Sequence, residues 1–375
     1  MKTYCRLFFV VILMLFQGCS SQQILKSHYD SAEQLLDDAV QLGIPGISVC
    51  YGSVDNYQCL QKGMMELESK TKVTSTTQFR TASITKTFTQ ALLFKLVELE
   101  LLDITKRFTD YVQTDITKNI PHIEQVKIID LIRHQSGIFN FTNTDDFELQ
   151  LFTHMDLNSE ILSPDDLLLY VINGKNSPSF LPGESTEYSN TGYILLGILI
   201  EEITGLSYAQ ALSKYILIPS GMANSSLEGR LTTSTLAANY TYANAWERLT
   251  QSQVGIGNGI LKDRDSLNEA NLYNVSNERK FFNAWAWSAG ALSSSATDLA
   301  KFLEMYLDGR YQTVNNPEKI AQYKTYGWMG GTTGIDVLMM YDVKEKNIYV
   351  VMLNATNAVI NSNDIYIKLR KLVHQ

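Results

Sequence analysis

The sequence lacks several features that would assign it to common functional classes. No run of basic residues occurs in its 375 residues, and 39 acidic against 31 basic side chains give a net charge of −8. An acidic chain without a basic run has no electrostatic attraction for nucleic acid, so we expect no nucleic-acid partner. Neither CxxC nor HExxH spacing is present, and we therefore expect no metal ion and no cofactor. The chain also contains no internal repeat and no low-complexity segment.

The N-terminal segment has the pattern of a targeting signal. Lys2 and Arg6 make a basic start, and the apolar run Leu7–Phe16 is too short to span a bilayer comfortably. We predict that residues 1–18 are a signal peptide. Cys19 then resembles the lipid-attachment cysteine of bacterial lipoproteins, and an ordinary secretory signal that is cut nearby is the alternative. Either way, we expect the mature chain to be exported, to the periplasm or as a membrane-anchored lipoprotein.

Few cysteines are available for disulfides. Of the four, Cys5 leaves with the signal segment, whereas Cys50 and Cys59 lie on two short apolar runs. In a hairpin whose turn centres on Val54 and Asp55, these two cysteines would lie opposite each other. An oxidising compartment is compatible with a disulfide between them, and two buried thiols on adjacent strands are the alternative.

The order of helix and strand patterns indicates an α/β domain that is interrupted by an all-α insertion. The predicted elements are a capped helix between Ser31 and Gly43, paired strands Ile47–Tyr51 and Tyr57–Gly63, a helix over Ile194–Ile203, paired strands Ile335–Asp342 and Ile348–Asn354, and a helix over Asn363–Val373. We predict a linker over residues 19–30, an α/β domain made of residues 31–105 and 286–375, and a mainly helical domain over residues 106–285.

The first chemical motif places a serine before a buried helix. Ser83 precedes the apolar segment Phe88–Leu102, and Lys86 follows three residues after it. Residues three apart share a helix face, so the hydroxyl and the amine can meet, and a desolvated amine can take the serine proton. A second Ser-x-x-Lys match at Ser69–Lys72 lies in a charged run that is typical of solvated surface. Burial of the following helix therefore favours Ser83.

The second motif is a tyrosine two residues before an asparagine. Tyr188 and Asn190 follow a Pro-Gly turn in Leu181–Glu184 and precede the apolar helix that begins at Ile194. On a loop at the helix entrance, they could present a phenol oxygen and a carboxamide to one cleft. For Tyr188 alone, a hydrogen-bonded structural tyrosine is the alternative.

The third motif is a glycine-rich stretch ahead of the C-terminal hairpin. Trp328, Gly330 and Gly331 lie in it, and we consider them candidates for substrate binding. Glycines in an edge strand allow the backbone to come close to a ligand. The alternative is a simple glycine-rich turn.

Taken in this order, the motifs resemble the serine β-lactamase and penicillin-binding-protein family, in its class C β-lactamase, D,D-carboxypeptidase and esterase branch. Three further strings carry the same resemblance, at residues 131–137, 220–222 and 289–300. The resemblance covers nearly the whole mature chain. It implies a β-lactamase/transpeptidase-like fold, in which an antiparallel sheet is flanked by terminal helices and joined to an all-α insertion domain.

The resemblance also implies a role for each motif residue. Ser83 attacks the carbonyl carbon and becomes acylated, and Lys86 accepts or relays its proton. Tyr188, as phenol or phenolate, takes part in proton transfer to the leaving group and activates water for deacylation. Asn190 holds the substrate amide or the Lys86 amine. The backbone N–H groups of Ser83 and Gly331 form the oxyanion hole.

One position departs from the family pattern. The third motif usually opens with a lysine or histidine that meets a substrate carboxylate, and here Trp328 stands in that place. An indole carries no charge, so an apolar or ester acyl group should fit better, as in the esterase members. Arg133 or Arg230 could restore the charge. The interval from Ser83 to Tyr188 is closer to that of D,D-peptidases than to that of class C β-lactamases.

We therefore predict an exported serine hydrolase that cleaves ester or amide bonds of a small-molecule or peptide acyl substrate through a Ser83 acyl-enzyme. The alternatives are a D-Ala-D-Ala carboxypeptidase, a class C-type β-lactamase, and a catalytically silent binding protein. A Ser-His-Asp mechanism is disfavoured, since none of the histidines matches a triad position, and His134 is interpreted as a loop histidine. Membrane attachment is expected only through a lipid on Cys19, and the sequence leaves the oligomeric state open.

Overall fold

The computed structural model describes most of the chain beyond the predicted signal segment. The described residues are 24–144, 147, 162–173, 178–227, 235–242, 272–276, 286–312 and 324–375. The predicted signal peptide, Cys19 and Arg230 lie outside them.

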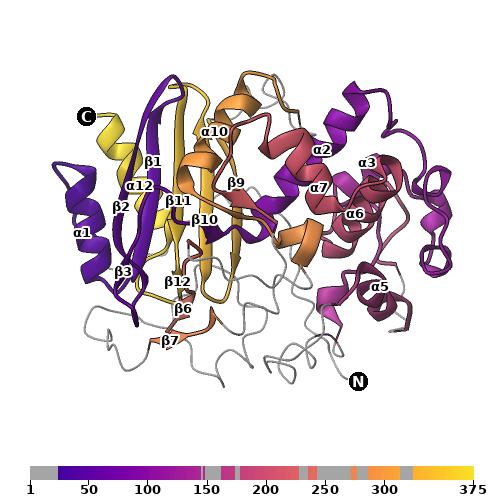
Figure 1. Ribbon diagram of the computed structural model, residues 1–375, viewed down its shortest axis with the longest axis horizontal. Helices are drawn as coiled ribbons and strands as arrows, with labels where there is room; N and C mark the ends of the chain where they lie inside the picture. Colours follow the sequence, from indigo (N-terminus) through magenta and orange to yellow (C-terminus); the bar gives the residue numbers. More distant parts are fainter. Residues whose placement is uncertain are drawn as a thin grey trace.

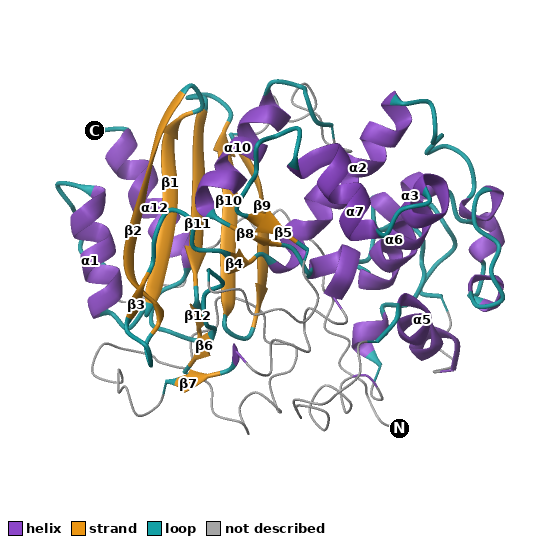
Figure 2. Ribbon diagram, viewed as in Figure 1, coloured by secondary structure: helices purple, strands orange, loops and turns teal. Residues whose placement is uncertain are grey.

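An antiparallel six-stranded sheet is the largest sheet among the described residues (Figures 1 and 2). Its strand order is β3-β2-β1-β11-β10-β9, and strands from the two ends of the chain meet where β1 pairs with β11. The strands are β1 (Gly46–Ser53), β2 (Asn56–Glu66), β3 (Thr71–Lys72), β9 (Thr325–Thr332), β10 (Ile335–Asp342) and β11 (Asn347–Leu353). Both predicted hairpins are confirmed, and β9 is the edge strand nearest the helical part of the molecule (Figure 1).

The first hairpin carries the disulfide. Cys50 pairs directly with Cys59 across β1 and β2, and the turn lies at Val54 and Asp55, as predicted. The two Cα atoms are 4.1 Å apart and the sulfur atoms are bonded. The alternative of two free thiols is therefore wrong in this structure.

The two faces of the sheet are covered by different helices. Consecutive side chains of a strand point to opposite faces, so Val49 packs in one core and Cys50 in another. Helices α1 (Ala32–Gln41) and α12 (Ser362–Val373) cover the Val49 face, which explains why both ends of the chain carry amphipathic helices. Helix α10 (Ala296–Leu307) packs against β1, β10 and β11 on the other face. The predicted sheet with flanking terminal helices is thus confirmed.

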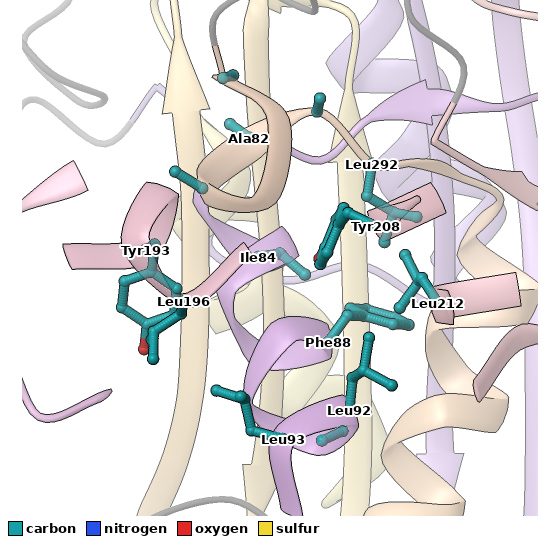
Figure 3. Close-up of a cluster of buried hydrophobic side chains, with 14 of the residues drawn as sticks. Ala82, Ile84, Phe88, Leu92, Leu93, Tyr193, Leu196, Tyr208, Leu212 and Leu292 are labelled. Atoms are coloured by element: carbon teal, nitrogen blue, oxygen red, sulfur yellow. The ribbon is translucent and has the colours of Figure 1, made fainter. Parts of the chain in front are cut away.

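Helices gather beside the β9 edge of the sheet (Figure 1). They are α2 (Thr85–Glu98), α3 (Ile128–Ile132), α5 (Pro164–Asn173), α6 (Asn190–Thr204) and α7 (Tyr208–Leu212), followed by a π-helical turn (Ser213–Leu217). Figure 3 shows Phe88 and Leu92 of α2 packed with Tyr208 and Leu212 of α7. This buried base supports the turn that carries Ser83, which directly precedes α2.

Helix α6 is buried from Thr191 to Gly197 and at Leu199 and Ile200, and it begins earlier than the sequence indicated. The structure starts the helix at Asn190 rather than at Ile194, so Asn190 belongs to the first helical turn and not to the preceding loop.

Among the described helices, none is individually long and apolar enough to cross a bilayer. Helix α6 and the Tyr208–Leu217 segment, which are bent by 76° relative to each other, are together long and apolar enough, by length and composition only.

Two small sheets connect the parts of the fold. β4 (Phe79–Arg80) pairs with β8 (Ser293–Ser294), which also pairs with β5 (Ser225–Ser226). β6 (Tyr240–Thr241) pairs with β7 (Tyr273–Asn274) and with β12 (Ala355–Thr356). Three of these short strands, β5, β6 and β7, fall within residues 106–285. The division of the chain at residues 105 and 286 stays a prediction.

Candidate active site

Ser83 lies in a short 3-10 turn, Ala82–Ile84, between β4 and α2. Thr81 anchors the start of this turn, because its backbone N–H and its hydroxyl both donate to the carbonyl oxygen of Leu292 at 2.9 Å. Ala82 has a φ of 45°, a conformation that costs a non-glycine residue about 1–3 kcal/mol. The surrounding contacts therefore hold the backbone in an unfavourable conformation directly before Ser83.

The hydroxyl of Ser83 faces two proton-carrying groups. The Nζ atom of Lys86 lies 3.2 Å from Ser83 Oγ, and the phenol oxygen of Tyr188 lies 2.6 Å from it. Lys86 comes from the first turn of α2, whereas Tyr188 comes from the loop that ends at α6. The structure therefore brings together the three residues whose meeting the sequence predicted.

Lys86 is held by two acceptors in addition to the serine. Its side chain is buried, with 5% exposure, and Nζ donates to Asn190 Oδ1 at 2.8 Å and to the carbonyl oxygen of Ala289 at 2.7 Å. A neutral amine has two N–H groups and one lone pair. In that form the two shorter contacts can take the two N–H groups, which leaves the lone pair for Ser83 Oγ, whereas an ammonium at the same place donates to all three oxygen atoms. This geometry fits an amine that accepts the serine proton.

Burial shifts the pKa values of the two groups in opposite senses. It lowers the pKa of the Lys86 amine well below 10.5. It raises the pKa of the Tyr188 phenol to about 12, against a smaller lowering by the hydrogen bond with Ser83. Both shifts favour the uncharged forms, so the site at neutral pH holds a phenol, not a phenolate, and the amine is the stronger candidate for the base.

Asn190 connects the site to the polypeptide around residue 140. Its Nδ2 donates to Thr142 Oγ1 at 3.2 Å, and its backbone N–H donates to Asn140 Oδ1 at 3.0 Å. The side-chain oxygen then faces Lys86 Nζ and the Tyr188 phenol, which lies 3.3 Å away. Because the amide nitrogen is engaged by Thr142, the amide oxygen is the atom presented to the lysine.

The third motif is a strand and not a turn. Gly330 and Gly331 lie in the edge strand β9, which packs against the Ala82–Ile84 turn. Trp328 is partly buried, and its ring meets those of Tyr306 at 5.2 Å and Tyr326 at 5.1 Å between centroids, both edge to face.

The described structure gives no support for an arginine that supplies the positive charge absent at Trp328. Arg133 is exposed at the end of α3, and Arg230 lies outside the described residues.

Across the ranges that the structure describes, no group of three or more His, Cys, Asp or Glu side chains could hold a metal ion.

Four neighbours of the site were not predicted as functional. They are His134, Asn140, Thr142 and the carbonyl group of Ala289. His134 and Ala289 fall in strings that carried the family resemblance, and that was the available signal. Asn140 and Thr142 lie in no motif, and only the folded chain brings them to Asn190.

Comparisons with known proteins agree with this fold. Residues 32–366 match the family model described as Beta-lactamase. A penicillin-binding protein of Bacillus subtilis is 27% identical over 192 residues, which are 51% of this chain and 40% of that protein. The chain therefore matches less than half the length of this curated relative.

Two solved structures resemble the described fold. A D-amino acid amidase from Ochrobactrum anthropi, complexed with D-phenylalanine, has a TM-score of 0.71 and 20% identity, covering 92% of this chain and 98% of that one. EstCE1, a hydrolase with promiscuous acyltransferase activity, has a TM-score of 0.66 and 17% identity, covering 92% and 97%. At these identities the likeness shows the fold.

The fold and the family model together define the class of protein as a serine hydrolase with a β-lactamase/transpeptidase-like fold. Since the family model spans most of its length, the chain belongs to the beta-lactamase family, as the motifs predicted.

Proposed function

We propose that this protein is an exported serine hydrolase that cleaves ester or amide bonds through an acyl-enzyme on Ser83. One observation carries the proposal: Ser83 Oγ lies within hydrogen-bond reach of both the Lys86 amine and the Tyr188 phenol. A serine beside a buried neutral amine can lose its proton as it attacks a carbonyl carbon.

The proposed reaction has two steps. In acylation, Ser83 Oγ bonds to the carbonyl carbon, its proton goes to Lys86, and the leaving alcohol or amine departs with a proton donated by Tyr188. The Lys86 ammonium then returns a proton to the Tyr188 phenolate, since both groups lie around Ser83 Oγ and Asn190 Oδ1. In deacylation, water attacks the acyl carbon and gives its proton to the Lys86 amine, the Lys86 ammonium returns a proton to Ser83 Oγ as the acyl–oxygen bond breaks, and the carboxylic acid is released. No cofactor enters either step.

The oxyanion hole is assigned to the backbone N–H groups of Ser83 and Gly331. Thr332 and Ile335 flank the two-residue turn between β9 and β10, and Gly331 pairs with Asp336 one position further on. Hydrogen-bonded and non-hydrogen-bonded pairs alternate along an antiparallel ladder. With Thr332 and Ile335 as the hydrogen-bonded pair that closes the turn, Gly331 and Asp336 form a non-hydrogen-bonded pair, so the N–H of Gly331 points away from β10. Because β9 is the edge strand and packs on the turn of Ser83, this N–H is available to the developing oxyanion.

The substrate preference follows from two residues in the middle of β9. Trp328 carries no charge, and the neighbouring Met329 is 45% exposed. We propose that the enzyme prefers uncharged, apolar acyl esters. Cleavage of amides is the second candidate, because a structural neighbour is a D-amino acid amidase. D,D-carboxypeptidase or β-lactamase activity is the third, because a curated relative is a penicillin-binding protein.

Export is part of the proposal and has independent support. The Cys50–Cys59 disulfide is compatible with an oxidising compartment, whereas disulfides are rare in the cytosol. Lipid attachment at Cys19 would hold the enzyme on a membrane. Labelling cells with a radioactive fatty acid, followed by isolation of the wild-type and Cys19→Ser proteins, tests this part, and label retained by the variant would refute it.

A fluorophosphonate probe tests the nucleophile. Wild type should be labelled and Ser83→Ala should not. The chain supplies a matched control in Ser69→Ala, which removes the serine of the exposed Ser-x-x-Lys match and should label like wild type. Unchanged labelling of Ser83→Ala would refute the assignment. Absence of labelling and of turnover across esters, peptides and lactams would favour a catalytically silent binding protein.

Intact-mass measurements separate the candidate activities. The protein is incubated in parallel with a β-lactam and with an activated apolar ester. Ester turnover without a lactam adduct is the expected result. A long-lived lactam adduct would instead indicate a penicillin-binding protein, and rapid lactam hydrolysis a β-lactamase.

A further inference from the structure

His134 contacts three consecutive residues around the catalytic candidate Tyr188. Its carbonyl oxygen accepts the N–H of Glu187 at 2.9 Å, and its ring Nδ1 accepts the N–H of Ser189 at 3.2 Å. Its ring stacks on the Tyr188 ring, with centroids 4.7 Å apart and planes inclined by 30°. One side chain and its own backbone therefore fix the tyrosine from both flanks and across one ring face.

The histidine itself is firmly placed. The segment that follows it runs beside the Pro-Gly loop, since Gly183 donates its N–H to the carbonyl of Gln135 at 2.8 Å and Ser179 donates to that of Gly137 at 3.0 Å. His134 has a φ of 57°, in the left-handed region. The same ring also contacts the buried Tyr193, with centroids 5.1 Å apart. His134 therefore lies in a loop, as the sequence predicted, and its ring and its backbone carbonyl are both engaged there.

The imidazole does not carry a proton for the reaction. Burial and, secondarily, Lys86 when that amine is protonated lower the pKa of His134 to about 3, so the ring is neutral at working pH. Since Nδ1 accepts from the Ser189 N–H, the ring proton sits on Nε2. Among the described side-chain hydrogen bonds of Ser83, none is to the His134 ring. The hydrogen bond and the ring stacking therefore place His134 against the Tyr188 segment and not against the nucleophile.

We propose that His134 is a positioning residue that holds the Tyr188 phenol against Ser83 Oγ, by stacking on its ring and by binding the backbone N–H on either side of it. The imidazole acts as an acceptor and a flat surface, and not as an acid or base. A phenol whose oxygen must lie 2.6 Å from the nucleophile needs such support, because it enters from a loop and not from within a helix. This inference rests on the proposed function.

A double-mutant cycle on the full chain tests the proposal. The second-order rate of fluorophosphonate labelling is measured for wild type, His134→Ala, Tyr188→Phe and the double variant. His134→Ala should slow labelling by about 10- to 100-fold, the range expected when a catalytic group is misplaced by about 1 Å. In the Tyr188→Phe background, the same change should have less than about a 3-fold effect, because the group that it positions is gone.

Two conservative variants separate the contacts. His134→Asn keeps an acceptor for the Ser189 N–H and tolerates the left-handed backbone, while it loses the ring. His134→Phe keeps the ring and loses the acceptor. Both should label faster than His134→Ala. The matched control is His122→Ala. His122 has a similar φ of 62°, and the hydrogen bond that the structure describes for its ring is to Gln125, outside the site.

The outcomes are distinguishable. If wild type itself is not labelled, the proposed function fails. If wild type is labelled, two results would refute the positioning role while the proposed function stands. In the first, His134→Ala is labelled as fast as wild type. In the second, His134→Ala lowers the labelling rate by the same factor with and without the Tyr188 hydroxyl. If His134→Ala does not fold by circular dichroism, His134→Asn is put through the same cycle, with the same two results deciding.

Discussion

Gly330 lies in direct contact with the carbonyl group of Thr81. A Cβ atom placed on Gly330 would come 2.0 Å from that carbonyl oxygen and 3.0 Å from the backbone nitrogen of Ile84. The edge strand β9 and the turn that carries Ser83 are therefore packed backbone against backbone. Any side chain at position 330 must push them apart, and the N–H groups of Ser83 and Gly331 with them.

Gly330→Ala should therefore slow catalysis. We expect the fluorophosphonate labelling rate to fall by about 10²-fold or more, because an oxyanion-hole donor moves away from the reacting carbonyl. Gly192→Ala is the control, since a Cβ atom there meets its nearest atom at 3.6 Å, an ordinary contact. Equal rates for Gly330→Ala and wild type would show that the two backbones need not touch.

The pH dependence of ester hydrolysis should report Lys86. Its neutral form is the base, so kcat/KM should rise with pH as the amine loses its proton. Because burial lowers the pKa of Lys86 well below 10.5, the rise should be complete well before that pH. Burial raises the pKa of Tyr188 to about 12, so no loss from its ionisation is expected until pH approaches that value.

The measurement is kcat/KM for an uncharged ester between about pH 5 and pH 10, where substrate charge does not change. A rate that is still increasing steeply at the upper end would mean that the base has an ordinary lysine pKa. That result would contradict the lowered pKa that burial gives to Lys86.

Substrate charge should matter because Trp328 stands where the family has a cation. For two activated esters of equal length, one neutral and one ending in a carboxylate, we expect kcat/KM to favour the neutral ester by about 10-fold or more, equal to about 1.4 kcal/mol. Trp328→Lys should narrow this ratio. Circular dichroism controls for folding, since Trp328 packs on Tyr306 and Tyr326. A preference for the carboxylate by wild type would refute the esterase assignment.

The disulfide should stabilise the fold without affecting the site. Cys50 and Cys59 are nine positions apart, and closing a loop of that size contributes about 2–3 kcal/mol in the chain-entropy model. Reducing the wild type should lower the free energy of unfolding in urea by up to this amount. Labelling of Ser83 should stay unchanged, because β1 and β2 are separated from β9 by β11 and β10. A Cys50→Ala/Cys59→Ala variant should not respond to the reductant.

Local chemistry explains which parts were predictable from the sequence. Ser83 and Lys86 are three residues apart, and helix geometry alone brings them together. Both hairpins were visible because their strands are adjacent in sequence and joined by short turns. The pairing of Tyr188 with Ser83, 105 residues away, came from a family resemblance and not from any local rule.

Other features depend on tertiary contacts that have no local signature. The apolar run predicts a helix that begins at Ile194, yet α6 begins at Asn190. Thr191 explains the difference, since its hydroxyl donates to the carbonyl of Phe139 and accepts the N–H of Phe141, which holds a polar first turn inside the protein. The backbone carbonyl of Ala289, an acceptor for Lys86, is likewise invisible in a sequence.

The most direct measurement is the location of the acyl group during turnover. The enzyme is mixed with an activated apolar ester, quenched in acid, and digested for tandem mass spectrometry. The account predicts an acyl group on the peptide that contains Ser83, at the serine itself, and none on the peptide that contains Ser69. Turnover with no acylated peptide, or with the acyl group on another residue, would contradict the central claim.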